Sequence, residues 1–218
     1  MTEEKILLAS GELTYFRAGS GSALLYLHPA GGVRRSAVLA GLADSFSLHV
    51  PVIPGFEGTE FHPGVQTRQA LAALVAEFAS RVIGGRCDVM GWSFGGAVAL
   101  WLALERPDLV HRLVLECPAG LVSIDQRIKR VNRALLEHYG AQDGKDEALL
   151  ARVAEVAHAT LIVQGTDDGT IPAASAELLK GRLENAALRY VPGAGHDLEV
   201  DAPARVLALV REFLGGSR

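Results

Sequence analysis

Short apolar runs and helical patterns alternate along most of the chain. The clearest strand is the apolar run at residues 23–28, which leads into a glycine-rich loop and suits a strand buried on both faces of a parallel sheet. Further apolar runs predict strands at residues 47–53, 88–91, 113–116, 160–164 and 188–191. Ahead of them, residues 5–9 and 12–17 flank Ser10 and Gly11 and predict an opening hairpin.

Helical patterns fill the spaces between these strands. After Thr67, a suitable N-cap, apolar side chains recur at helical spacing at Leu71, Leu74, Val75, Phe78 and Val82. Residues 95–105 are apolar nearly all round, which predicts a deeply buried helix that stops before Pro107. A last amphipathic helix begins near Pro203 and ends at Gly215. This alternation predicts an α/β fold, with a mostly parallel central sheet and helices on both faces.

A longer segment interrupts the alternation between residues 116 and 160. It is about three times the dozen residues that a simple crossover needs. Its first apolar stripe consists of Ile124, Ile128, Val131 and Leu135, and its second of Leu149, Leu150, Val153 and Val156. We interpret residues 122–159 as a small helical cap insertion in a single domain that spans residues 1–218. The cap would roof a site; decoration of the surface is the alternative.

Composition and charge narrow the classes of partner. Of the 218 residues, 49% are hydrophobic and 21% are charged, which argues against a disordered chain. The net charge is −4 and no dense basic run is present, so we expect no nucleic-acid partner. No apolar run reaches the roughly 18–20 residues that span a bilayer, so we expect no membrane partner. The oligomeric state stays open.

The first residues and the cysteines suggest a reducing compartment. Glu3 and Glu4 precede only a short apolar run, which does not resemble a signal peptide. Cys87 and Cys117 make neither a disulfide framework nor a zinc motif, and we interpret both as small buried apolar residues. We therefore expect a cytoplasmic protein. Because the glycine pairs are too sparse for a phosphate loop, and no cluster of histidines and carboxylates suggests a metal, we expect no cofactor.

One pentapeptide carries the strongest chemical signal. Residues 91–95 read Gly-Trp-Ser-Phe-Gly, between a predicted strand and the buried helix. In so tight a turn, Gly91 and Gly95 remove Cβ atoms that would clash. The turn presents the hydroxyl of Ser93 at a helix N-terminus, where unpaired N–H groups favour developing negative charge. Ser93 is therefore the candidate nucleophile.

This motif in this setting resembles the α/β-hydrolase superfamily, and the resemblance extends over nearly the whole chain. Such enzymes carry an oxyanion loop after an early strand, which corresponds to residues 28–32, His-Pro-Ala-Gly-Gly, although Pro29 replaces the commoner glycine. By position, the resemblance implies that the backbone N–H groups of Ala30 and Phe94 form the oxyanion hole. Residues 54–59 resemble a further turn of the family.

A serine hydroxyl needs a base, and the base needs an acid that orients it. His196 follows the last strand in the sequence Gly193-Ala194-Gly195-His196, where the family places its histidine, and Pro203 follows at the expected spacing. The family pattern after the strand at 160–164 places the acid at Asp168. Glu116, at the end of the preceding strand, and the neighbouring Asp167 are the alternatives. The order Ser93, Asp168, His196 is the one expected for this fold.

The resemblance implies a carboxylesterase-like serine hydrolase that cleaves small-molecule esters through an acyl-serine intermediate, without a metal. Thioester hydrolysis and hydrolysis of an activated carbon–carbon bond use the same triad and stay open. A ligand-binding sensor of the same fold with slow turnover is an alternative from another class. Beneath the cap, we expect Ile171 and Leu198 to form apolar walls of the substrate pocket.

Overall fold

The computed structural model describes residues 1–124, 133–140 and 144–215, and of residues 133–135 the backbone alone. The strands are Thr2–Leu8 (β1), Gly11–Ala18 (β2), Ser22–Leu27 (β3), Phe46–Pro51 (β4), Cys87–Trp92 (β5), Val110–Glu116 (β6), Thr160–Gly165 (β7) and Ala186–Val191 (β8). The α-helices are Ala37–Leu42 (α1), Arg68–Phe78 (α2), Phe94–Glu105 (α3), Arg133–His138 (α4), Glu147–Arg152 (α5), Ala173–Arg182 (α6), Leu198–Asp201 (α7) and Pro203–Gly215 (α8).

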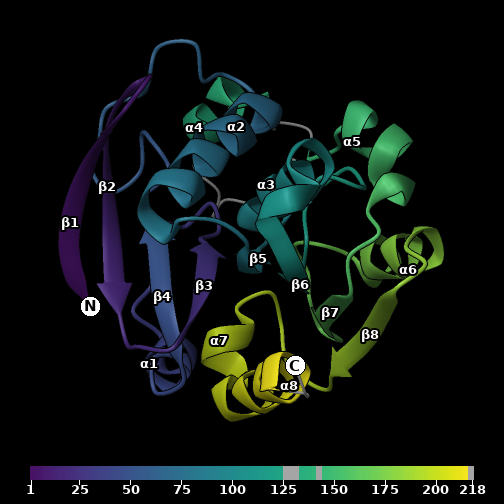
Figure 1. Ribbon diagram of the computed structural model, residues 1–218. Helices are drawn as coiled ribbons and strands as arrows, with labels where there is room; N and C mark the ends of the chain where they lie inside the picture. Colours follow the sequence, from purple (N-terminus) through teal and green to yellow (C-terminus); the bar gives the residue numbers. More distant parts are fainter. Residues whose placement is uncertain (125–132, 141–143, 216–218) are drawn as a thin grey trace.

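The eight strands form one sheet in the order β1-β2-β4-β3-β5-β6-β7-β8 (Figure 1). The hairpin of β1 and β2 joins the sheet antiparallel to β4, and all pairs from β4 to β8 are parallel. The carboxyl ends of the parallel strands therefore lie at one edge, where open α/β sheets hold their sites.

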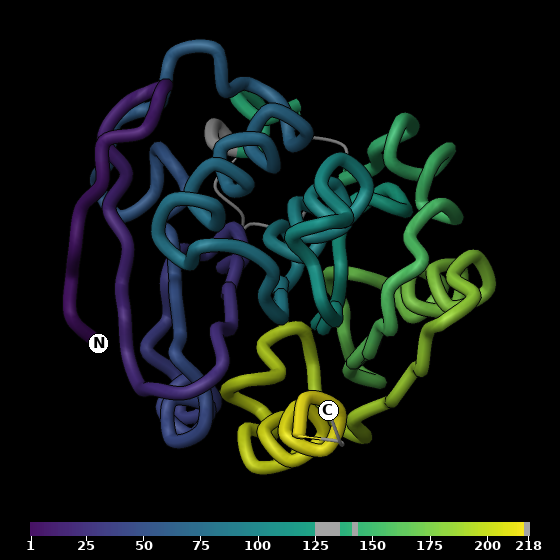
Figure 2. Tube along the Cα trace, in the orientation of Figure 1, coloured from purple at the N-terminus to yellow at the C-terminus, as the bar shows by residue number. Residues whose placement is uncertain are grey.

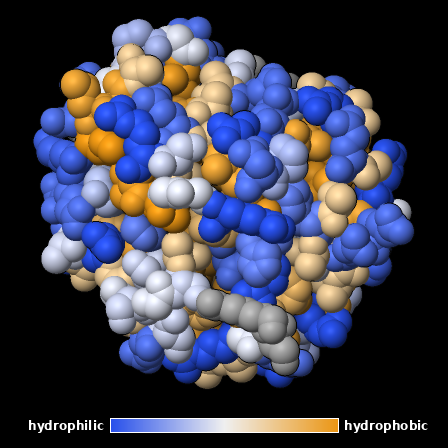
Figure 3. Space-filling view, in the orientation of Figure 1, coloured by the Kyte–Doolittle hydropathy of each residue, from blue (hydrophilic) through white to orange (hydrophobic). Residues whose placement is uncertain are grey.

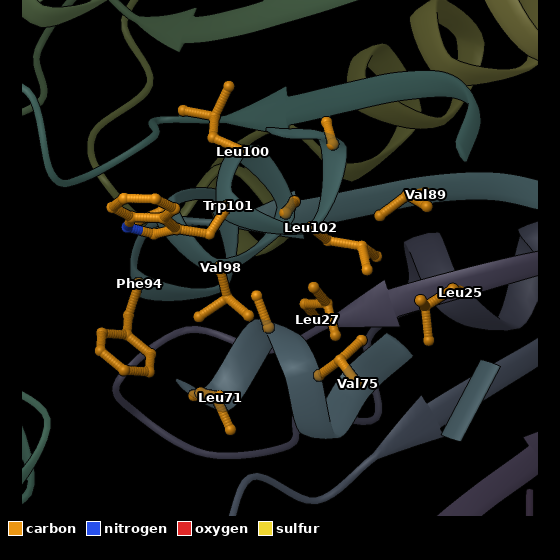
Figure 4. Packing of buried hydrophobic residues seen from close by; sticks show 14 of the residues in the cluster. Leu25, Leu27, Leu71, Val75, Val89, Phe94, Val98, Leu100, Trp101 and Leu102 are labelled. Carbon is orange, nitrogen blue, oxygen red and sulfur yellow. The ribbon is translucent and has the colours of Figure 1, made fainter. Parts of the chain in front are cut away.

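Helices cover both faces of the sheet, as the sequence predicts. One core packs α2, α3, α5 and α6 against one face, and Figure 4 shows Leu71 and Val75 of α2 beside Val98 and Leu102 of α3. The other core packs α1 and α8 against the opposite face. Successive strand residues alternate between the two cores, because side chains in a strand point to opposite faces.

Most predicted elements are confirmed, with small differences in their bounds. Thr67 caps α2, since its hydroxyl accepts a hydrogen bond from the N–H of Ala70 at 3.0 Å. The sequence reading did not identify α1 and α6. Helix α6 buries only Ser175, Ala176 and Leu179 and has no clear apolar stripe.

In the described part of the insertion lie two short helices, α4 and α5, followed by a 3-10 turn at Val153–Glu155. Leu149, Val153 and Val156 of the second predicted stripe are buried. Ile124 of the first stripe precedes the helix rather than belonging to it. Ile128 and Val131 lie outside the described residues, as does the side chain of Leu135.

The surface is mixed in character. On the face seen in Figure 1, hydrophilic residues are interspersed with small apolar groups (Figure 3). The chain starts in the strand β1 at one edge of the sheet, whereas its last helix, α8, lies against one face (Figure 2). Among the residues that the structure describes, no helix is both long enough and apolar enough to cross a membrane.

The turn from β5 into α3 brings the backbone of α3 close to β3. A Cβ atom added at Gly95 would overlap the carbonyl oxygen of Leu27, and one added at Gly91 would lie 2.5 Å from the carbonyl oxygen of Gly95. Only glycine therefore fits at both positions, as the sequence pattern indicates.

Gly95→Ala is expected to lower the free energy of unfolding by at least about 2 kcal/mol, because β3 and α3 must separate to admit the methyl group. Gly181→Ala is the matched control, since Gly181 lies in α6 with nothing within 4 Å of an added Cβ. It should stabilise the protein by up to about 1 kcal/mol. Urea titration of both variants tests this; equal effects would contradict it.

Candidate active site

Ser93 lies at the tip of the turn between β5 and α3. Its backbone has φ 53°, a conformation that costs energy in a non-glycine residue. Hydrogen bonds hold it there: its N–H donates to the carbonyl of Glu116 at 2.8 Å, and its own carbonyl accepts from Gly96 and Ala119, both at 3.0 Å. These hydrogen bonds hold the backbone of Ser93, and with it the start of the side chain, in place at the carboxyl end of β5.

His196 joins Ser93 to Asp168. Its Nε2 lies 3.0 Å from the Oγ of Ser93, and its Nδ1 lies 2.9 Å from Oδ2 of Asp168. Since an ionised carboxylate only accepts hydrogen bonds, Nδ1 carries the proton and Nε2 is left to accept from the hydroxyl. The structure thus brings together three candidate residues from the loops after β5, β7 and β8.

Asp168 is held in the ionised form. Its Oδ1 accepts hydrogen bonds from the N–H groups of Thr170 and Ile171, each at 2.8 Å. Burial opposes the charge, but the hydrogen bond with His196, the attraction to that imidazole and these two N–H groups outweigh it and lower the pKa of the carboxyl.

The two alternative acids are placed differently. Asp167 is exposed and accepts a hydrogen bond from the hydroxyl of Thr166 at 2.8 Å. Glu116 is fully buried, and burial together with the nearby Glu199 raises the pKa of its carboxyl well above the usual range. Neither residue is hydrogen-bonded to His196 among the described contacts.

Two side chains support the loop that contains Ala30. His28 is fully buried; its Nδ1 donates to the carbonyl of Pro29 at 2.8 Å and its Nε2 accepts from the N–H of Ile53 at 3.0 Å. Glu57 accepts from the N–H of Val33 at 2.9 Å. Sequence reasoning placed His28 at the start of the expected oxyanion loop but did not identify Glu57.

A cavity of about 570 Å³ opens over Ser93. Ala30, Phe94, Ile171 and His196 line it. Leu198 does not line it. As the first residue of α7, Leu198 is fully buried in the core under α8, on the other side of the loop that holds His196.

The cap side of the cavity is formed by Ile124, Leu136, Gly144 and Arg68. Sequence reasoning missed Arg68, whose side chain is only 5% exposed and whose Nε lies 3.1 Å from a carboxylate oxygen of Asp146. Its Nη2 also donates to the carbonyls of Gly140 and Lys145 at 3.3 Å. The available signal was an arginine on the buried stripe of α2, three residues before Leu71.

A second contact ties the cap to the body. The hydroxyl of Tyr139, which follows α4, donates to the carbonyl of Pro54 at 2.6 Å, and the Tyr139 ring lies 5.8 Å from that of Phe94. Together with Arg68, this contact fixes the end of α4 beside the cavity.

One group of potential metal ligands occurs among the described residues: Cys117, Asp168 and His196, whose ligand atoms lie within 4.8 Å of one another. Burial first, and then the charge of Asp168, raise the pKa of the Cys117 thiol. A protonated thiol is a poor ligand, whereas metal binding needs the thiolate. The hydrogen bonds of Asp168 and His196 account for the group without a metal.

The chain matches the family model described as alpha/beta hydrolase fold over residues 23–133. Among curated proteins, it is 24% identical to a pimeloyl-[acyl-carrier protein] methyl ester esterase of Aeromonas hydrophila, over 91% of this chain and 98% of that one. It is 26% identical to a 2-hydroxymuconate semialdehyde hydrolase of a Pseudomonas species, over 95% and 92%.

Solved structures show the same fold. A hydrolase from Pseudomonas aeruginosa superposes with a TM-score of 0.85 at 22% identity, over 98% of each chain. A meta-cleavage product hydrolase from Pseudomonas fluorescens superposes with a TM-score of 0.80 at 19% identity, over 99% of this chain and 98% of that one.

His28 makes folding depend on pH. Burial lowers its pKa from 6.5 to about 4, so the folded protein resists a protonation that the unfolded chain accepts. The resulting stability, about 3 kcal/mol, is complete above pH 6.5 and is lost as the pH falls toward 4. His28→Gln should lower Tm at pH 8 but flatten its decline between pH 7 and 4.5. Parallel Tm curves would contradict this role.

Proposed function

The chain belongs to the alpha/beta hydrolase fold family, and from that premise we propose that it is a serine hydrolase that cleaves small-molecule carboxylic esters. The observation that carries the proposal is the unbroken line of hydrogen bonds from Ser93 through His196 to Asp168 at the floor of a cavity. This arrangement suits acyl transfer through a covalent acyl-serine.

In the first step, Nε2 of His196 accepts the proton of the Ser93 hydroxyl as Oγ attacks the ester carbonyl. The imidazole becomes a cation, which the carboxylate of Asp168 stabilises from 2.9 Å. Asp168 also fixes the tautomer, because its oxygen accepts the proton on Nδ1.

The attack places negative charge on the former carbonyl oxygen. The N–H groups of Ala30 and Phe94 are the donors that we assign to it; both residues line the cavity beside Ser93. Phe94 is the first residue of α3, where a backbone N–H has no partner inside the helix and the helix dipole favours negative charge.

His196 then donates its proton to the leaving alcohol, which departs and leaves an acyl-Ser93. A water molecule gives its proton to the same nitrogen and attacks the acyl group, and the reverse transfer restores the Ser93 hydroxyl. The proton transfers between Ser93 and His196 run along a contact of 3.0 Å that is already formed.

The cap suggests which acyl groups fit. Phe94, Ile124, Leu136 and Ile171 give the cavity an apolar side, while Arg68 and Tyr139 hold the end of α4 in place. A cavity of about 570 Å³ with a fixed short roof favours small or medium acyl groups and needs no activation at a lipid interface.

Ser93→Ala is expected to lower kcat on a p-nitrophenyl ester by about 10⁶-fold, and Asp168→Asn by about 10⁴-fold, with the fold intact. Asp167→Asn is the matched control, because Asp167 is the exposed neighbour of Asp168 and takes no part in the hydrogen bonds that join Ser93, His196 and Asp168. It should change kcat by less than about twofold. Equal losses in the two aspartate variants would show that the acid is assigned wrongly.

The same assay discriminates between reactions. Wild-type protein should turn over p-nitrophenyl esters many times per site and faster than acyl-CoA thioesters of equal chain length. A single acyl group released per site would instead indicate a sensor, and faster thioester cleavage would indicate a thioesterase.

Leu136→Trp fills the cap side of the cavity, since Leu136 lines it and is 6% exposed. In a series from acetyl to palmitoyl esters, this variant should raise KM for medium chains and leave acetyl turnover nearly unchanged. Leu7→Trp, at an exposed position on β1, is the control and should change nothing. If wild-type activity were highest on the palmitoyl ester and rose sharply at the substrate concentration where micelles form, the proposal of a small pocket would be contradicted.

A further inference from the structure

Two carboxyl groups lie buried behind the candidate active site and take no part in the reaction derived above. Glu116 is the last residue of β6 and is fully buried. Glu199 lies in α7, three residues after His196, and is 2% exposed. Acidic side chains are almost never this deeply buried unless they are paired, so both groups require an explanation.

Their hydrogen bonds are incomplete. The hydroxyl of Tyr26, on β3, donates to Oε1 of Glu199 at 2.9 Å, and this bond is itself buried. Within the described part of the chain, Oε2 of Glu199 and both carboxyl oxygens of Glu116 have no hydrogen-bond partner. Three buried oxygens without donors cannot all belong to ionised carboxylates, because each would carry a large desolvation cost.

The charges around the two groups explain how the cost is reduced. Burial raises the pKa of both carboxyls, and the charge of Glu199 raises that of Glu116 further. The nearby hydroxyl of Ser36, the hydrogen bond from Tyr26 and the cation of Arg34 act in the opposite direction on Glu199 alone. When two carboxyls influence each other and only one has donors and a cation, the proton resides on the other.

Each member of the pair is connected to a reacting group. The backbone carbonyl of Glu116 accepts the hydrogen bond from the N–H of Ser93 at 2.8 Å. Glu199 ties α7 to β3, and α7 follows directly after the loop that carries His196. That loop is held on its other side by the indole of Trp92, which donates to the carbonyl of His196 at 3.2 Å.

We propose that Glu116, fully buried with neither carboxyl oxygen hydrogen-bonded, is neutral, and that ionised Glu199 acts through Tyr26 as a positioning residue for the loop that carries His196. The part that concerns His196 rests on the proposed function. The pair keeps the total charge behind Ser93 at −1 and gives the loop an anchor in the sheet.

The groups that face the pair come from every neighbouring element. They are Tyr26 on β3, Arg34 and Ser36 in the segment before α1, and Cys117 directly after β6. Arg34 is the cation among them, and its guanidinium is also 3.2 Å from the carboxylate of Asp197. The burial of Tyr26 and Cys117 raises both of their pKa values, so neither ionises before the pair.

A proton held by buried Glu116 links folding to pH in a defined direction. The folded protein holds a proton that the unfolded chain releases above the ordinary glutamate pKa of about 4.3. The native state is therefore favoured at low pH, and this contribution is lost as the pH rises toward the folded pKa. Glu116→Gln keeps the size and neutrality of the side chain but removes the titration.

The first test measures Tm of wild type and Glu116→Gln from pH 5 to pH 8. We expect the Tm of Glu116→Gln to rise relative to that of wild type as the pH increases, so that the difference between the two Tm values is largest at pH 8. A difference that is the same at every pH would show that Glu116 contributes packing alone and would overturn the assignment of a proton to Glu116. This readout needs no enzymatic activity, so it stands even if the proposed function fails.

The second test measures positioning. Glu199→Ala and Tyr26→Phe should each lower kcat on a p-nitrophenyl ester by up to about 10²-fold with KM unchanged, because a small displacement of His196 slows proton transfer but leaves the cavity intact. Glu199→Gln should retain more activity than Glu199→Ala, since its amide oxygen still accepts from Tyr26. Equal kcat in all four proteins, or losses confined to KM, would overturn the positioning role.

Discussion

The candidate site depends on the strained turn at Ser93. This turn joins β5 to α3, and the backbone there packs so closely that no Cβ atom fits at Gly91 or Gly95. The positive φ of Ser93 lifts the hydroxyl out of the sheet, and Gly91 and Gly95 let α3 start against β3. The strain is balanced by the bonds from Ser93 to the backbone of β6 and of the following loop.

The rest of the fold delivers partners to this fixed point. Parallel pairing puts the ends of β5, β7 and β8 at one edge, so residues separated by 28 and by 103 positions meet within hydrogen-bonding distance. The loops need separate supports because, unlike the strands, they are not held by a series of backbone hydrogen bonds to a neighbouring strand. His28 braces one, Trp92 and the buried acid pair brace another, and the Arg68–Asp146 ion pair holds the cap.

The spacing of apolar residues predicted the sheet and the main helices, because an element that is buried on one or two faces carries apolar residues at the positions that lie on those faces. The tight turn at Ser93 was also predictable, since such a turn requires neighbouring glycines, whereas the position of His196 followed from the resemblance to the family. Helix α6 was not predictable, because it buries few large side chains. Leu198 was misplaced and Arg68 was missed for one reason: whether a side chain points into a cavity or a core depends on the tilt of a short helix, which spacing does not encode.

The central claim is that Ser93, activated by His196, is the nucleophile. Treatment with a fluorophosphonate probe, followed by peptide mapping with mass spectrometry, tests it most directly, because the probe bonds only to an activated serine. The account predicts one adduct per chain, located on Ser93, and a severe loss of labelling rate in His196→Ala. Labelling of a different serine, or equal labelling rates in wild type and His196→Ala, would contradict it.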